Sequence, residues 1–127
     1  MLLTILDYSV WIEYLKNNPR YFSRISKLLE CGEILAVECV FGELIQNAKT
    51  RKEREIIQKY WKHLPKVNYE NIIIEAGIYS AENKLYEHGI DLLEAIILMH
   101  GIISNSKIWT LDKNFLEIIP DELKYAE

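Results

Sequence analysis

Short apolar runs alternate with stretches of helical periodicity along this chain. Apolar runs at residues 2–6, which end at Asp7, and at residues 33–37 predict strands that are buried on both faces of a parallel sheet. Another strand is predicted at residues 107–111, directly before Asp112, with a brief strand or connector at Val67 and an edge strand at residues 123–126. The predicted sheet is therefore mostly parallel.

Helical spacing fills the intervals between these strands. Ser9 is predicted to cap the first helix, and Asn18 to cap a second helix that has Pro19 in its first turn, carries Phe22 inward and ends at Gly32. Further helices are predicted at residues 38–48, 49–62, 72–88 and 92–103, with residues 112–115 as a loop or short helix. This alternation predicts an α/β fold, a three-layer α/β/α sandwich with a mostly parallel central sheet.

Composition agrees with one folded domain over residues 1–127. The chain has 50% hydrophobic and 27% charged residues, which is typical of a globular protein. Its apolar segments are too short to cross a bilayer and no basic leader precedes them, so we expect a cytoplasmic protein without membrane attachment. Cys31 and Cys39 lack metal-ligand spacing and are predicted to be reduced, buried residues.

A formal net charge of -4 and a pI near 5.4 argue against a protein that coats nucleic acid. The most basic stretch, residues 49–62, also contains Glu53 and Glu55, and it is more typical of a solvated helix face than of a phosphate-binding edge. His63, His88 and His100 have no ligand spacing with one another. The three tryptophans, Trp11, Trp61 and Trp109, fall on apolar faces, which favours core or dimer contacts over base stacking.

Four acidic residues occupy the positions where ligands bind in open parallel sheets. Asp7 and Asp112 directly follow predicted strands, Asp91 opens a helix after Gly89, and Glu43 lies among apolar neighbours on a helix. Each one alone is more typical of a helix cap or a surface acid. Together they indicate a carboxylate cluster, which needs a cation to offset its repulsion, and all-oxygen ligands favour Mg²⁺ or Mn²⁺. The chemistry that follows is phosphodiester hydrolysis by metal-activated water.

The same residues carry a resemblance to a known family. Residues 5–15 (ILDYSVWIEYL), 40–44 (VFGEL), 89–93 (GIDLL) and 108–115 (IWTLDKNF) resemble, in order and spacing, the successive motifs of the PIN-domain ribonucleases. The size and the short N-terminal motif resemble most the VapC-type toxins of toxin–antitoxin pairs. The resemblance implies a PIN-like fold, a Mg²⁺- or Mn²⁺-dependent endoribonuclease acting on RNA, a homodimer, and a cognate antitoxin protein that covers the site.

The resemblance also implies roles for individual residues. Asp7 and Asp91 would be direct metal ligands, Glu43 and Asp112 would complete the catalytic set, and Ser9 and Thr110 would orient the carboxylates by hydrogen bonds. Three positions depart from the family's pattern. Tyr8 replaces a small hydroxyl residue, Asn114 replaces a further acid, and Glu94 replaces an aliphatic residue, so that Glu94 and Asn114 are expected at the edge of the site.

Two other classes of protein remain open from the sequence. Tyr8 and Asn114 are compatible with a catalytically inactive PIN-like module that binds RNA or protein. Acids at strand ends also occur in phosphoacceptor signalling domains, but such domains have paired acids after the first strand, and Asp7 stands alone.

Overall fold

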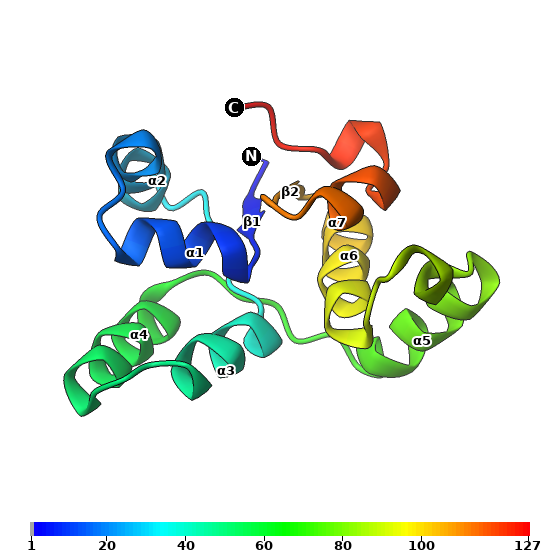
Figure 1. Ribbon diagram of the computed structural model, residues 1–127, viewed down its shortest axis with the longest axis horizontal. Coiled ribbons are helices and arrows are strands. Elements are labelled where there is room, and N and C mark those ends of the chain that lie inside the picture. Colours follow the sequence, from blue (N-terminus) through cyan, green and yellow to red (C-terminus); the bar gives the residue numbers. More distant parts are fainter. Residues whose placement is uncertain (1) are drawn as a thin grey trace.

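The computed structural model describes residues 2–127 and shows an α/β fold whose sheet is small and parallel (Figure 1). Strand β1 (Thr4–Leu6) pairs in parallel with β2 (Lys107–Trp109), with Ile5 opposite Ile108. These two central residues are fully buried. The predicted parallel sheet is therefore confirmed for these two strands.

Single parallel bridges extend this sheet on both sides. Residue pairs Thr4–Ile34 and Ala36–Lys66 continue it beyond β1, and the pair Ile108–Lys124 continues it beyond β2. The strand predicted at residues 33–37 is thus present only as isolated bridges, because Ile34 and Ala36 pair with neighbours on opposite sides. The predicted connector near Val67 and the predicted edge strand at residues 123–126 each contribute one bridge, at Lys66 and Lys124.

The N-terminal helices are α1 (Tyr8–Leu15) and α2 (Pro19–Glu30). The predicted cap at Ser9 is wrong, because Asp7 caps α1 by accepting from the backbone N–H of Val10, and Ser9 lies inside the helix. Asn18 caps α2 as predicted. The predicted inward position of Phe22 is also wrong: Tyr21 is buried in its place, and Phe22 stacks on Tyr14 at the surface.

The central helices are α3 (Glu38–Gln46) and α4 (Arg51–His63). Helix α4 begins two residues later than predicted because the Thr50 side chain caps it by accepting from the Glu53 N–H. The predicted burial of both cysteines is not observed, since Cys31 is exposed and Cys39 is half-buried at the start of α3.

The C-terminal half contains α5 (Ile72–Glu82), a 3-10 turn η1 (Leu85–His88), α6 (Leu92–Ser104), α7 (Lys113–Ile118) and a 3-10 turn η2 (Asp121–Leu123). One continuous helix was predicted over residues 72–88. It is interrupted because Lys84 adopts a left-handed conformation, with φ of 51°. The predicted helix at residues 92–103 matches α6 to within one residue.

The helices place the sheet in the middle of the molecule. Figure 1 shows β1 between α1 and α2 on one side and α6 on the other. One hydrophobic cluster includes residues from both strands and from α1, α3 and α6. Within residues 2–127, no helix combines the length and the apolar character needed to cross a membrane. This arrangement brings the carboxyl ends of β1 and β2 to the same edge of the sheet as the start of α6.

Candidate functional site

Asp7 sits at the carboxyl end of β1 and is 6% exposed. Its Oδ1 atom accepts hydrogen bonds from the Ser9 hydroxyl and from the Val10 N–H, and its Oδ2 atom accepts from the Thr110 hydroxyl. Burial raises the pKa of Asp7 above its usual value, and these hydrogen bonds partly oppose the rise. The carboxylate is therefore held in one orientation in a nearly dry environment.

Hydrogen bonds also connect the end of β2 and the residues after it to Asp7 and Ser9. The Asp7 N–H donates to the carbonyl of Trp109 at 3.1 Å, and the Leu111 N–H donates to the Ser9 hydroxyl at 3.0 Å. The Thr110 hydroxyl, which donates to Asp7, also accepts from the Asp112 N–H at 3.0 Å. Ser9 and Thr110 thus join two segments that lie about a hundred residues apart in the sequence.

Asp112 and Asp91 both occupy the caps of helices that begin at this edge. Asp112 caps α7 by accepting from the N–H groups of Asn114 and Phe115. Asp91 caps α6 in a reciprocal arrangement: its side chain accepts from the Glu94 N–H at 2.9 Å, and Glu94 Oε1 accepts from the Asp91 N–H at 3.1 Å. Both aspartates are exposed, so their outer oxygens face solvent.

Asn114 lies beside the loop that leads into α6. A Cβ atom built on Gly89 would stand 3.6 Å from the Asn114 Nδ2 atom, which shows that the first turn of α7 packs against this loop. Gly89 has a φ of 76°, a backbone conformation that glycine adopts without strain. The contact brings the starts of α6 and α7 together.

Repulsion between like charges shows that the predicted acids are neighbours. The pKa of Glu43 is raised by burial and then by the negative charges of Asp91 and Asp7. Burial raises the pKa of Glu94 to about 7, with further contributions from the charges of Asp91, Asp112 and Asp7. We call this group of five carboxylates the acid edge: Asp7, Glu43, Asp91, Glu94 and Asp112.

The acid edge fits a divalent cation in the type of its donors and in its charge. Carboxylate oxygens are the ligands that Mg²⁺ and Mn²⁺ prefer, and a cation would relieve the repulsion that raises the pKa values of Glu43 and Glu94. Within residues 2–127, however, no three acidic, histidine or cysteine side chains are already arranged as a set that could hold a metal ion. The predicted ligand set therefore stays a prediction.

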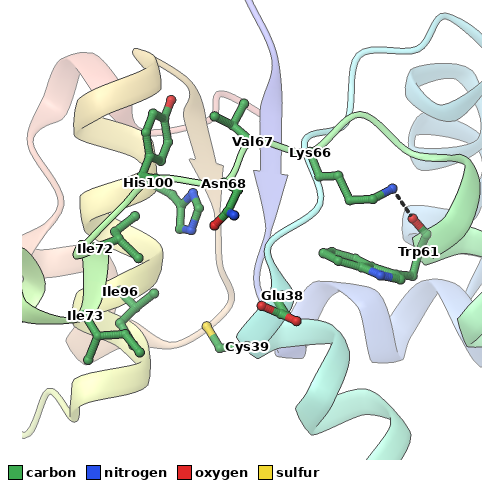
Figure 2. Close-up of a pocket in the computed structure, with 11 residues that line it drawn as sticks. Glu38, Cys39, Trp61, Lys66, Val67, Asn68, Ile72, Ile73, Ile96 and His100 are labelled. Carbon is green, nitrogen blue, oxygen red and sulfur yellow. Dashed lines mark hydrogen bonds between the residues drawn. The ribbon is translucent and has the colours of Figure 1, made fainter.

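A cavity of about 430 Å³ lies near this edge, and it could hardly be predicted from the sequence (Figure 2). Its walls come from the first turn of α3, from residues 66–69, and from α5 and α6. His100 of α6 lines it and is 6% exposed. The only signal in the sequence was a polar residue that interrupts the apolar stretch of α6.

Comparison with known proteins supports the fold. No protein-family model matches the sequence, and no curated protein matches it either. Among solved structures, a chain of VapBC2 from Rickettsia felis, bound to a DNA fragment from its promoter, has a TM-score of 0.71 at 17% identity. The match covers 97% of the present chain and 96% of the Rickettsia chain.

A chain from a toxin–antitoxin complex of Klebsiella pneumoniae gives a TM-score of 0.69 at 16% identity, covering 96% of the present chain and 99% of its own. At these identities the likeness shows a shared fold. The resemblance to VapC-type PIN proteins that the sequence predicted is therefore confirmed at the level of the fold.

Proposed function

We propose that this chain is a Mg²⁺- or Mn²⁺-dependent endoribonuclease and the toxin of a toxin–antitoxin pair. The observation that carries the proposal is the acid edge, where burial and the negative charges of neighbouring aspartates raise the pKa values of Glu43 and Glu94 near the carboxyl ends of two parallel strands. Similarity in fold to chains of toxin–antitoxin complexes supports the biological context. A single PIN-like domain with three layers, as the sequence predicted, is part of this proposal.

The chain's own residues would divide the work as follows. Asp7 and Asp91 would bind the cation directly, with Glu43 and Asp112 completing the set. A divalent cation held there would supply a Lewis acid that polarises the phosphodiester and activates water. Ser9 and Thr110 fix the orientation of the Asp7 carboxylate through their hydroxyl groups. Glu94, whose pKa is about 7, can hold or release a proton near neutral pH.

Three partners belong to this proposal. The substrate is RNA, a cognate antitoxin covers the site, and a second copy of the chain forms a homodimer. The acid edge repels RNA, so affinity for RNA must come from the cation and from basic side chains elsewhere. The first turn of α4 offers such side chains, because Arg51, Lys52 and Arg54 are all exposed.

Charge reversal on α4 tests this basic surface. We expect the triple variant Lys49→Glu, Arg51→Glu, Lys52→Glu to bind RNA more weakly and to show a shallower dependence of affinity on salt, by roughly one unit of slope per lost phosphate contact. Reversal of three exposed residues on α2, Arg20, Arg24 and Lys27, serves as the matched control. Equal losses in the two variants would show that α4 has no special role.

One observation favours the alternative function, a PIN-like module that binds RNA or protein without catalysis. Asp7, Asp91 and Asp112 each cap a helix, and a cap is a sufficient structural reason for an aspartate. Substitution by asparagine separates the two functions, because asparagine caps a helix about as well as aspartate does but carries no charge. At position 7 the Thr110 hydroxyl can also reverse its role and accept from the amide.

The test is cleavage of RNA in Mg²⁺ or Mn²⁺ by wild type, Asp7→Asn and Asp91→Asn. We expect each variant to lose at least about 100-fold in rate while its melting temperature is retained or raised, since removal of even supporting groups around a metal costs 10- to 100-fold. The control is Asp121→Asn, which removes an exposed aspartate outside the acid edge. Cleavage at the wild-type rate by Asp7→Asn would refute the ribonuclease proposal and favour the binding module.

A further inference from the structure

The cavity beside the acid edge has a chemistry of its own. Figure 2 shows Glu38 and Cys39 of α3 at one end, Ile96 and His100 of α6 on one wall, and Trp61 on the opposite side. Ile72, Ile73 and Ile96 make part of the wall apolar, whereas Asn68 and Glu38 add hydrogen-bonding groups. Its volume of about 430 Å³ is within the range of pockets that bind small organic ligands.

His100 is the unusual member of this wall. The residue is only 6% exposed. Its Nδ1 atom is buried and has no hydrogen-bond partner among residues 2–127. Burial lowers the pKa of His100, so the ring is neutral at physiological pH. A buried polar atom without a partner is costly, so a ligand that reached this nitrogen through a small rotation of the ring would gain a favourable hydrogen bond.

The rest of the cavity favours a flat and uncharged ligand. The Tyr69 and His100 rings have their centroids 5.5 Å apart, which gives one wall aromatic character. The cavity's lysine, Lys66, is already engaged: its ammonium donates to the carbonyls of Trp61 at 2.7 Å and Leu64 at 3.1 Å (Figure 2). With this cation occupied and Glu38 present, an anionic ligand is disfavoured, whereas a planar ring with polar edges suits the walls.

The cavity also lies close to the acid edge. The Cys39 thiol, which lines the cavity, lies 4.0 Å from the Leu93 carbonyl, between Asp91 and Glu94 in the sequence. The charges of Glu43 and Asp91 also help to raise the pKa of Cys39, which is consistent with their proximity.

We propose that this cavity, which we call the His100 pocket, binds one base of the RNA that passes the acid edge, with the His100 ring and the Asn68 amide contacting the polar edge of that base. The inference rests on the proposed ribonuclease function for the identity of the ligand. It makes His100 and Asn68 determinants of sequence preference, and it assigns them no part in the chemical step.

The test measures binding in EDTA, where metal-dependent cleavage cannot occur. Adenosine, guanosine, cytidine and uridine are titrated separately into the protein while the NMR signals of the Trp61 indole and the His100 ring are followed. We expect at least one nucleoside to shift both signals and ribose 5-phosphate to shift neither. Absence of a response to all four nucleosides would overturn the proposal.

Two variants define the role of the side chains. His100→Phe keeps a flat ring but removes the nitrogen, so we expect nucleoside affinity to fall by about 3- to 10-fold while the melting temperature rises, because the unpaired buried atom is gone. Asn68→Ala, at an exposed position, should weaken binding without affecting folding. The matched control is His88→Phe, which alters an exposed histidine outside the pocket. Full affinity in both pocket variants would contradict the proposal.

A tetraribonucleotide identifies the source of the base. If the pocket serves RNA, the oligonucleotide binds more tightly than the best nucleoside and shifts the same signals; equal affinity would indicate a free nucleoside as the ligand and overturn the RNA assignment. The proposed catalytic function is judged separately by the Asp7→Asn cleavage assay. Nucleoside binding without any RNA cleavage would refute the ribonuclease proposal but not the proposed base-binding pocket. RNA cleavage without nucleoside binding would refute the pocket but not the ribonuclease proposal.

Discussion

Replacement of Glu94 by glutamine should stabilise the metal-free protein, by an amount that grows from about pH 4.5 and reaches its full size above pH 7. Glu94 Oε1 accepts a hydrogen bond from the Asp91 N–H, and the glutamine oxygen can accept the same bond, so the helix cap is preserved. The substitution removes a negative charge that burial and the charges of Asp91, Asp112 and Asp7 disfavour. The effect should therefore follow the ionisation of the glutamate.

The direction of this effect on stability follows from the pKa values of Glu94 in the folded and the unfolded protein. Glu94 has a pKa of about 7 in the folded protein, above its usual value of 4.5. Below pH 4.5 the carboxyl is protonated in both states and costs nothing. Between pH 4.5 and about 7 the unfolded chain ionises first, so the stability of wild type falls as pH rises, and the full penalty is present above pH 7.

The size of the stability penalty follows from the difference between these two pKa values. At 1.36 kcal/mol per pKa unit the full penalty is about 3 kcal/mol, and screening by the solvent that reaches this half-buried side chain reduces it to about 1–2 kcal/mol. For a domain of this length that corresponds to a rise in melting temperature of roughly 5 °C at pH 8. At pH 4.5 the variant and wild type should melt together.

The assay is thermal unfolding in EDTA at pH 4.5 and pH 8, with Glu53→Gln as the matched control. Glu53 holds the same position in the first turn of α4: it accepts from the Lys49 N–H at 2.7 Å, and its own N–H donates to Thr50. It is exposed and lies in a basic stretch. A gain for Glu94→Gln that is equal at both pH values, or matched by Glu53→Gln, would refute the electrostatic explanation.

Two further predictions concern the metal and the core. Asp91→Asn should raise the melting temperature of the metal-free protein. It should also abolish the stabilisation that Mn²⁺ gives wild type, which is about 2.7 kcal/mol of unfolding free energy when the ion is present at a hundred times its dissociation constant. Stabilisation by Mn²⁺ that persists in the variant would exclude Asp91 as a ligand. Gly101→Ala should lower the free energy of unfolding by about 1–3 kcal/mol, because its Cβ would stand 2.6 Å from Ile108 Cδ1 in the core. Gly77→Ala in α5, where a Cβ would meet nothing within 4 Å, should instead raise the free energy of unfolding by about 0.5–1 kcal/mol. Urea titrations in which both alanine variants change the free energy of unfolding in the same direction would contradict the packing argument.

Several features of the fold could be predicted from the sequence because they depend on local pattern. The apolar runs at β1 and β2 are buried, and the position of Asp7 directly after β1 follows from chain order alone. The strand predicted at residues 107–111 ends earlier, at Trp109, so Asp112 lies three residues beyond β2. Asn18 caps α2 and Asp91 caps α6, where short polar residues precede helical periodicity. Each of these features is decided by neighbours within a few residues.

The local sequence pattern was not sufficient to predict positions whose environment depends on residues far away in the sequence. Ser9 looked like a helix cap, yet its hydroxyl lies between Asp7 and the Leu111 N–H at the other end of the chain. Tyr21 and Phe22 are equally apolar neighbours, and only packing against Trp109 and Tyr14 decides which one is buried. Periodicity reports which face of a helix is apolar, but the elements that cover that face are set by the tertiary fold.

The sequence by itself determined the order of the elements, the resemblance to the PIN fold and the acids at the strand ends. Only the tertiary structure decided that burial and neighbouring charges raise the pKa of Glu94, and that His100 lines a cavity near those acids while its Nδ1 atom is buried without a hydrogen-bond partner among residues 2–127. The physical reason is that charge repulsion and desolvation depend on distances in space, which the separation of residues along the chain does not fix.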